Sequence, residues 1–207
     1  MKSQQTFQSL IESRVTTGHF DATRAVSHEA VRQLVRLATK APSAFNLQNW
    51  RFVAVRSSEA KELLCELAYG QAQVKEAAVT FIVCGQLDGY RDLPETLQPS
   101  VEVGAIPASL GAKWSSMVAE LHQDNPQLRR DEAFRSASLA AMILMLAAQD
   151  QGLASGAMSG FDPEAVVSRF ELGEQFVPVM LVTVGHPAGS RRPQKVRKPV
   201  GEILEFR

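Results

Sequence analysis

Val79-Thr80-Phe81-Ile82-Val83-Cys84-Gly85 is the stretch that decides the fold, because it is short and almost entirely apolar. A run of this length is typical of a β-strand. Since polar residues do not alternate with the apolar ones, the strand is expected to be buried on both of its faces. The run therefore predicts the central strand of a small sheet.

Further strands and helices are predicted on either side of this run. Strand-like residues occupy 51–56 and 177–184, where Pro178 fits only near a strand start or on an edge strand. Apolar residues at helical spacing, with start signals such as Ser27, Ser57 and Asp162, predict the helices. Their expected ranges are 4–13, 28–40, 59–68, 108–121, 131–151 and 163–170. Prolines and two glycines make 86–104 an expected irregular surface excursion.

Helices and strands are mixed along the chain without strict alternation. This pattern indicates one α+β domain over residues 1–207. The helix expected at 131–151 is apolar nearly all round, which favours burial in a core or contact with a partner subunit.

Composition narrows the functional classes. The 207 residues carry 22 basic and 22 acidic side chains, so no net charge draws the protein toward nucleic acid or a membrane. No apolar run approaches the length of a membrane span, and the first residues lack an apolar signal core. Cys65 and Cys84 lack metal-ligand spacing and are expected to be buried free thiols. We therefore expect a cytoplasmic protein.

Motifs for dedicated catalytic machinery are absent from the sequence. It contains no GxGxxG after a first strand, no phosphate-binding GxxxxGK[ST], no HExxH and no GxSxG. The histidines are scattered, at positions 19, 28, 122 and 186. Since no acid–base group stands out, a bound cofactor is expected to carry the difficult chemical step.

Three polar segments have compositions suited to binding a phosphate. Residues 14–18 offer Arg14 and two hydroxyls, the 42–50 loop offers hydroxyl, amide and backbone donors, and 193–199 offers Lys195 and Arg197. Hydroxyls, backbone amides and arginine forks are common phosphate ligands. Taken singly, each segment is more typical of a solvated surface or an ordinary connection.

Read together, four segments match a known family in order and separation. Residues 14–20 read Arg-Val-Thr-Thr-Gly-His-Phe, and 41–50 contain the pattern Ala-Pro-Ser-x-x-Asn-x-Gln-x-Trp. Residues 152–160 are rich in glycine, and 195–199 read Lys-x-Arg-x-Pro. The chain thereby resembles the nitroreductase family of FMN-dependent enzymes that oxidise NADH or NADPH.

The resemblance implies a fold and an assembly. The family fold is a three-layer α+β sandwich, in which helices flank a small mixed, mainly antiparallel sheet. Its members form domain-exchanged homodimers, with each FMN at the subunit interface and the C-terminal segments exchanged.

The resemblance also implies which residues hold the cofactor. Arg14, Lys195 and Arg197 would bind the FMN phosphate. Thr16, which replaces the serine of the family pattern, would bind the phosphate or the ribityl chain.

Around the flavin ring, the loop residues Pro42, Ser43 and Asn46 would reach the cofactor of the neighbouring subunit. The backbone N–H groups of Ser159 and Gly160 would lie near flavin N5. No side chain is expected to act as an acid or base. The complete implied cofactor-binding set is Arg14, Val15, Thr16, Gly18, Pro42, Ser43, Ala44, Asn46, Gly70, Gln73, Ser159, Gly160, Lys195 and Arg197.

Three positions depart from the family pattern at the pyrimidine edge of the flavin. Gly18 stands where many members carry Lys or Arg, Gly70 where many carry Asn, and Gln73 where some carry a second Lys. Reduced flavin is anionic at its N1–C2=O edge, so the loss of cations would make FMN harder to reduce. Alternatively, the amide of Gln71 or Gln73 donates to this edge and the potential changes little.

The function implied is that of an FMN-dependent oxidoreductase. It would take hydride from NADH or NADPH and reduce electron-poor small molecules such as nitroaromatics, quinones or activated alkenes by a ping-pong route. One alternative is a relative specialised for aldehydes, enals or enones. Another is a flavin store or redox sensor with little turnover. A second copy of the chain is the expected partner, and neither nucleic acid nor a membrane is.

Overall fold

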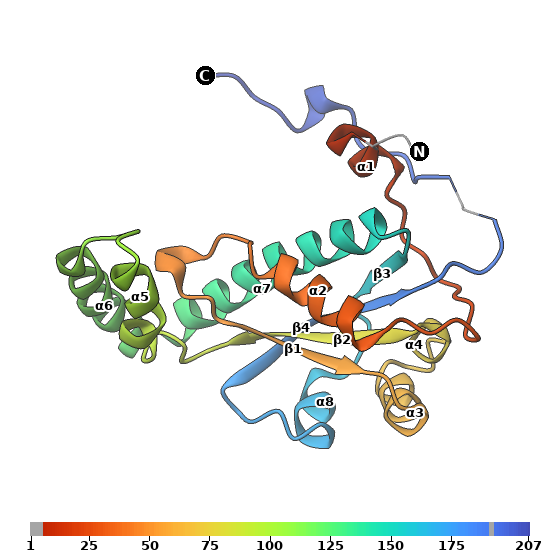
Figure 1. Cartoon of the computed structure of the whole chain (residues 1–207), viewed down its shortest axis with the longest axis horizontal. Coiled ribbons are helices and arrows are strands. Elements are labelled where there is room, and N and C mark those ends of the chain that lie inside the picture. Colours follow the sequence, from red (N-terminus) through yellow and green to blue (C-terminus); the bar gives the residue numbers. More distant parts are fainter. Residues whose placement is uncertain (1–5, 191–192) are drawn as a thin grey trace.

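Antiparallel strands form one four-stranded sheet at the centre of the structure (Figure 1). The computed structural model describes residues 6–190 and 193–207. The spatial order of the strands is β1-β2-β4-β3, with bounds β1 (Trp50–Val55), β2 (Val79–Gln86), β3 (Ala154–Met158) and β4 (Phe176–Gly185). The sequence predicts a mixed, mainly antiparallel sheet. Within the described residues, the parallel pairing consists of one bridge, between Thr16 and Ser155.

Strand β2 is the centre of the fold, as its apolar run predicts. Val79, Phe81 and Val83 belong to one hydrophobic core, and Ile82 and Cys84 belong to another. Every residue of β2 except the last is buried, so the prediction of burial on both faces is confirmed.

Proline in β4 is accommodated near the start of that strand, as expected. Pro178 is the third residue of β4, and it lies opposite Cys84, where the pairing with β2 shifts register. A bulge tolerates a residue that lacks a backbone N–H, because the ladder is already interrupted there.

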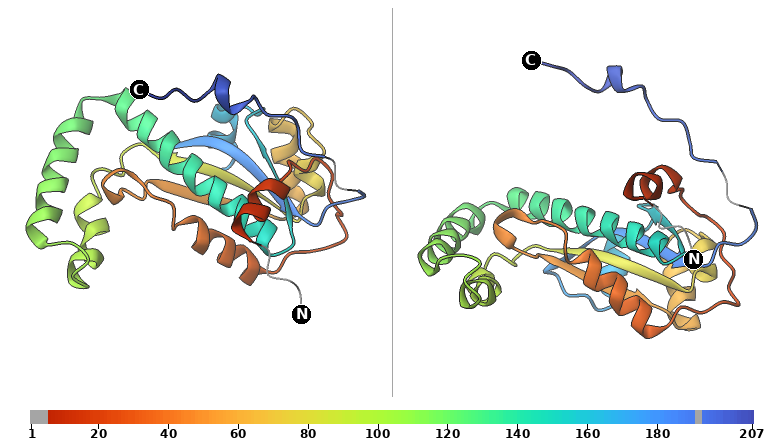
Figure 2. Two further views of the ribbon diagram at one scale, coloured as in Figure 1. Left: turned by 90° about the horizontal axis from the view of Figure 1, so that it is seen from above. Right: turned by 45° about the horizontal axis from the view of Figure 1, so that its top comes forward.

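Helices cover both faces of the sheet (Figures 1 and 2). Helices α2 (His28–Ala38) and α7 (Pro126–Asp150) lie over one face, and α3 (Ser58–Leu67) and α8 (Pro163–Arg169) lie over the other. The predicted caps are confirmed, since the side chains of Ser27, Ser57 and Asp162 each accept a hydrogen bond from a first-turn N–H.

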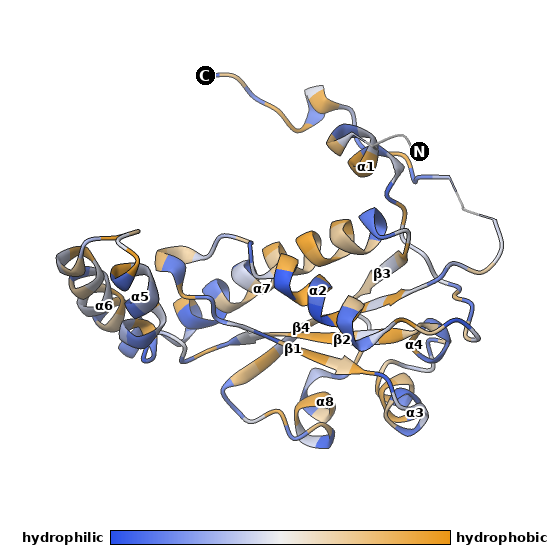
Figure 3. Cartoon of the chain, in the orientation of Figure 1, coloured by the Kyte–Doolittle hydropathy of each residue, from blue (hydrophilic) through white to orange (hydrophobic). Residues whose placement is uncertain are grey.

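Helix α7 is longer than predicted and begins at Pro126, behind the N-cap Asn125. Buried alanines in its second half allow it to approach the sheet closely. Hydrophobic residues are concentrated on the strands and on the second half of α7 (Figure 3). Leu139 and Met142 remain 47% and 37% exposed, so the outer side of α7 is apolar and uncovered.

The prediction of an irregular segment at 86–104 is wrong. Residues Leu93–Glu102 form helix α5, which is followed by α6 (Ala108–Gln123), and both lie at one end of the sheet (Figure 1). Pro94 occupies the first turn of α5, where its missing N–H is not needed. Burial of Leu93 and Leu97 outweighs the local signal of Pro99 against a helix.

Two short elements were also not predicted. Residues 152–160, expected as a glycine-rich segment, contain strand β3, although Ala154–Met158 lacks β-branched residues. The single-turn helix α4 (Gln73–Glu76) lies beside α3. Both owe their structure to neighbouring elements rather than to local propensity.

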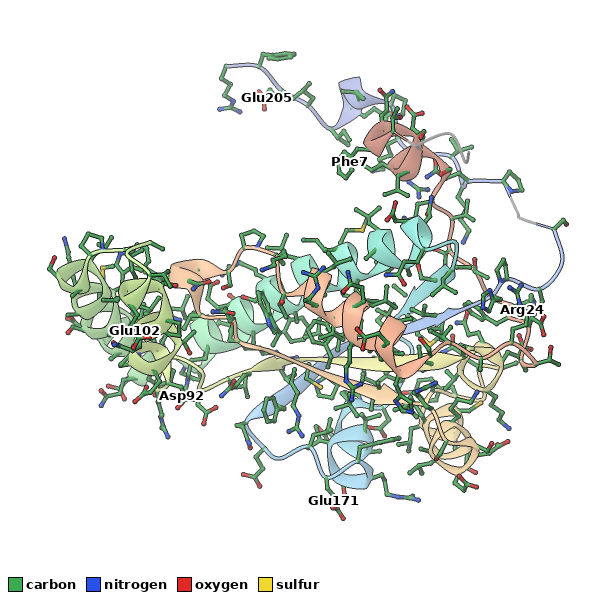
Figure 4. All side chains as sticks on the ribbon, viewed as in Figure 1. Phe7, Arg24, Asp92, Glu102, Glu171 and Glu205 are labelled. Atoms are coloured by element: carbon green, nitrogen blue, oxygen red, sulfur yellow. The ribbon has the colours of Figure 1, made fainter. Side chains whose placement is uncertain are left out.

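Phe7 and Glu205 both lie on the side of the sheet that α7 covers (Figure 4). Helix α1 (Phe7–Ser13) is tied to α7, because the Gln149 side-chain amide donates to the carbonyl of Leu10. The C-terminal tail, residues 193–207, is exposed and contains the short 3₁₀ helix η2 (Val200–Glu202). The first residues of the predicted helix 4–13, and Arg191 and Arg192, lie outside the described residues.

Both cysteines are buried free thiols, as predicted. Burial raises the pKa of Cys84 to about 12, so this thiol stays protonated at neutral pH. In the described part of the chain, no helix combines the length and the apolarity that crossing a membrane requires.

The contact of β2 with α7 depends on Gly85. A β-carbon at this position would lie 2.6 Å from both the Cβ and the backbone oxygen of Ala133. We expect Gly85→Ala to lower the free energy of unfolding by about 1–3 kcal/mol, because α7 must move away from the strand. Urea denaturation measures this change. Gly201→Ala is the control, since a β-carbon there meets no atom within 4 Å. Equal stability of the two variants would contradict the close approach.

Candidate functional site

The segment Arg14–Gly18 runs along the outer edge of strand β3. Thr16 forms a parallel bridge with Ser155, and the Thr17 N–H donates to the Ser155 carbonyl at 2.9 Å. This approach requires Gly156, because a β-carbon there would lie 2.4 Å from the carbonyl oxygen of Thr17. The segment thus extends the sheet beyond β3.

Helix α4 holds the far end of the same segment. The Phe20 N–H donates to the Glu76 carboxylate at 3.1 Å, and His19 Nδ1 lies 3.5 Å from the same carboxylate. The Phe20 ring is buried in a small cluster with Ala77 and Ala154. Residues 14–20 are therefore fixed between β3 and α4.

Two glutamine side chains form an amide chain beside this segment. Gln71 Nε2 lies 3.1 Å from the Ala68 carbonyl and 2.7 Å from the Gly160 carbonyl. Two carbonyl acceptors identify this atom as the amide nitrogen, so Gln71 Oε1 is the acceptor for Gln73 Nε2, at 3.4 Å. Both NH₂ groups are engaged within the protein.

The side-chain oxygen of Gln73, Oε1, lies close to both Gly18 and Gly156. A β-carbon at Gly18 would be 3.6 Å from Gln73 Oε1, and one at Gly156 would be 3.5 Å from it. This part of the site therefore presents a carbonyl oxygen.

The neighbouring Lys75 forms a hydrogen-bonded ion pair with Glu62, and the hydrogen bond raises the pKa of Lys75. The Lys75 ammonium is therefore engaged by Glu62 of α3.

Several donors around the segment have no partner in the part of the chain that the structure describes. Gly18 and Gly160 are exposed, and among residues 6–190 and 193–207 no acceptor bonds their N–H groups. The half-buried Arg14 has no carboxylate partner in the same ranges, and the Thr16 side chain is exposed. Unpaired arginine beside free amides and a hydroxyl is suited to an anionic group such as a phosphate.

The basic tail begins at this site. Gln194 Nε2 donates to the Arg14 carbonyl at 3.0 Å. Lys195 and Arg197 follow Gln194 closely in the chain, so their backbone starts beside the Arg14 segment. Both side chains are exposed, and the Arg197 guanidinium donates to the Lys195 carbonyl at 2.7 Å. The cations of the tail are thus available to a ligand or to a second chain.

The structure brings three of the four predicted segments together, namely 14–18, 159–160 and the start of the tail. The fourth, the 42–46 loop, lies at the opposite end of the sheet, beside α5 and α6 (Figures 1 and 2). Arg24, just beyond the first segment, and Glu102 of α5 mark these opposite ends (Figure 4). Within one chain, Pro42, Ser43, Ala44 and Asn46 therefore do not join Arg14.

Gly70 has a local structural role. It follows α3 with φ +75°, and its N–H donates to the Cys65 carbonyl at 2.9 Å, which closes the helix. A β-carbon there would meet no atom within 4 Å, so the position is open to solvent or to a ligand.

Sequence reasoning missed Glu76 and Gly156, and it named Gln71 only as an alternative donor. No motif marks Glu76, because its role depends on α4 lying next to Phe20. Gly156 lies within the glycine-rich segment, where only the contact with Thr17 distinguishes it from its neighbours.

Among the described residues, no group of His, Cys, Asp and Glu side chains could hold a metal ion.

Comparisons with known proteins agree with this geometry. The model of the nitroreductase family matches residues 11–186. YodC of Bacillus subtilis (strain 168), whose name assigns it provisionally to the NAD(P)H nitroreductases, is 35% identical over 94% of this chain and 95% of its own length.

Solved structures show the same fold. One is an FMN complex of a protein from Exiguobacterium sibiricum 255-15, assigned provisionally to the nitroreductases. Its TM-score is 0.91 at 26% identity, over 98% of this chain and 97% of that one. A nitroreductase family protein from Streptococcus pneumoniae TIGR4 has a TM-score of 0.81 at 32% identity, over 98% of this chain and 100% of its own.

Proposed function

We propose that this chain, which belongs to the nitroreductase family, is an FMN-dependent oxidoreductase that uses NADH or NADPH to reduce electron-poor small molecules. The observation that carries the proposal is the convergence of unpaired Arg14, the free amides of Gly18 and Gly160, and the basic tail at one edge of the sheet. This donor set matches an anionic, hydrogen-bonding cofactor. It also fits the FMN complex of the Exiguobacterium sibiricum relative.

The residues of the chain divide the work of binding. Arg14, Lys195 and Arg197 neutralise the phosphate, and the Thr16 hydroxyl donates to the phosphate or the ribityl chain. The backbone of Ser159 and Gly160 offers N–H donors to the flavin ring. When bound, FMN supplies the hydride-transfer chemistry, so the protein needs only to position two reactants in turn, as in a ping-pong route.

The second wall of the site comes, in this proposal, from another copy of the chain. Pro42 and Asn46 are exposed, but they lie at the end of the sheet remote from Arg14. A homodimer would bring the loop of one subunit to the Arg14 segment of the other. The exposed apolar residues of α1, α7 and the tail support such an assembly, and the buried free thiols support the cytoplasm as its location.

Nitroaromatics, quinones and activated alkenes are the substrate classes we propose. A second candidate function, flavin storage or redox sensing with little turnover, is favoured by one observation. The side chain beside Gly18 presents a carbonyl oxygen where a cation would assist reduction.

Colour separates these candidates. We expect the purified protein, supplied with FMN, to be yellow and to lose its visible absorbance anaerobically on addition of NADH or NADPH. Absorbance should return when a quinone is added. Yellow protein that does not bleach would support the storage function, and protein that never retains FMN would overturn both candidates.

Removal of the tail arginine tests the phosphate assignment. We expect Arg197→Ala to raise the dissociation constant for FMN by about tenfold or more, since a charge-assisted hydrogen bond is lost. Fluorescence titration of the apoprotein measures the constant. Lys198→Ala, in the same exposed tail, is the matched control and is expected to bind FMN like the unchanged protein. Unchanged binding by Arg197→Ala would show that the phosphate lies elsewhere.

A cation beside Gly18 tests the electrostatics of the flavin ring. We expect Gln73→Lys to raise the midpoint potential of bound FMN by about 30 mV, which equals about 1.4 kcal/mol for two electrons. The reason is that reduction adds negative charge to the ring. Spectroelectrochemical titration measures the potential, and Gln73→Met controls for loss of the amide chain without added charge. A potential that is equal in all three proteins would contradict a role of this position.

A further inference from the structure

The 42–48 loop has an unfavourable backbone. Phe45, Asn46 and Gln48 have φ values of 52°, 58° and 48°, which is the left-handed region. Asparagine tolerates this conformation, but phenylalanine has no side-chain hydrogen bond to compensate for it. Interactions outside the local backbone must therefore hold Phe45 in place.

Local hydrogen bonds fix only part of the loop. The Asn46 N–H donates to the Ser43 carbonyl, and the Gln48 N–H donates to the Ser43 hydroxyl at 2.9 Å. These bonds connect the loop to itself. They do not anchor it to the rest of the protein.

The anchor is the hairpin of α5 and α6. The Phe45 ring meets the Trp114 ring of α6 edge to face, with centroids 6.0 Å apart and planes at 78°. Leu47 is buried in a third hydrophobic core together with Tyr90, Leu93, Leu97 and Val118. That core contains no strand residue, so the loop packs with the hairpin and not with the sheet.

The opposite side of the loop is less tightly packed. Pro42, Ser43 and Ala44 face α7 across a pocket of about 180 Å³. Ser136 of α7 lines this pocket, and its buried hydroxyl has no partner among the described residues. The loop therefore has room to shift toward α7 if the hairpin releases it.

We propose that Trp114 is a positioning residue for the cofactor site. Through its contact with Phe45, the α5–α6 hairpin keeps the loop in the strained conformation that presents Pro42, Ser43 and Asn46 to FMN. This inference rests on the proposed function, because it requires the loop to be a wall of the FMN site.

A double-mutant cycle tests the proposal. The proteins are Trp114→Ala, Phe45→Ala, the double variant and the conservative variant Trp114→Phe, and the measured quantity is the dissociation constant for FMN. We expect each alanine variant to bind FMN about tenfold more weakly, the double variant to bind no more weakly than either, and Trp114→Phe to recover most of the affinity. Lys113→Ala, an exposed position on the same helix, is the control.

Amide hydrogen exchange of residues 43–48 in the apoprotein gives a second, cofactor-independent measurement. It should accelerate in both alanine variants and not in Trp114→Phe or Lys113→Ala. Additive losses in affinity, or a loop whose exchange is unchanged in Trp114→Ala, would overturn the proposal. If the protein without substitutions fails to bind FMN, the proposed function is wrong. The exchange measurement then still decides whether Trp114 positions the loop.

Discussion

Burial of strand β2 on both faces is the constraint on which the other elements depend. Its side chains alternate between two hydrophobic cores, so helices must cover each face of the sheet. Alanines let α7 lie close to the strands, and Gly85 lets β2 touch the α7 backbone. With both faces occupied, the exposed polar groups of the candidate site are confined to the edge and the ends of the sheet.

At the β3 edge, the site is assembled as an extension of the sheet. Gly156 permits the pairing with Arg14–Gly18, and Glu76 of α4 fixes the far end. The arrangement separates two electrostatic environments. A half-buried arginine and a basic tail lie at one end of the segment, whereas a neutral amide chain lies beside Gly18. An anionic group is favoured at the first, and the second presents the amide oxygen of Gln73.

At the opposite end of the sheet, the 42–48 loop is held in place by its packing against the α5–α6 hairpin. The loop and the hairpin share a hydrophobic core that includes no residue of the sheet, while a pocket separates the loop from α7. Each chain therefore carries two incomplete parts of the proposed site, built on different cores and remote from each other (Figure 1). In the proposed homodimer, a second copy of the chain would join the two parts, and the position of the hairpin would then affect how the flavin is held.

The sequence by itself determined the central strand, the helices with their caps at Ser27, Ser57 and Asp162, and the four segments that resemble the family, because these follow from local side-chain patterns. It did not reveal α5, where buried leucines outweigh Pro99, or β3, whose small residues become a strand only by pairing with β4. Tertiary structure alone decided that Gln73 turns its oxygen toward Gly18, that Glu76 holds Phe20, and that the loop packs on Trp114. Each of these depends on contacts between residues distant in the chain, and local propensity carries no information about such contacts.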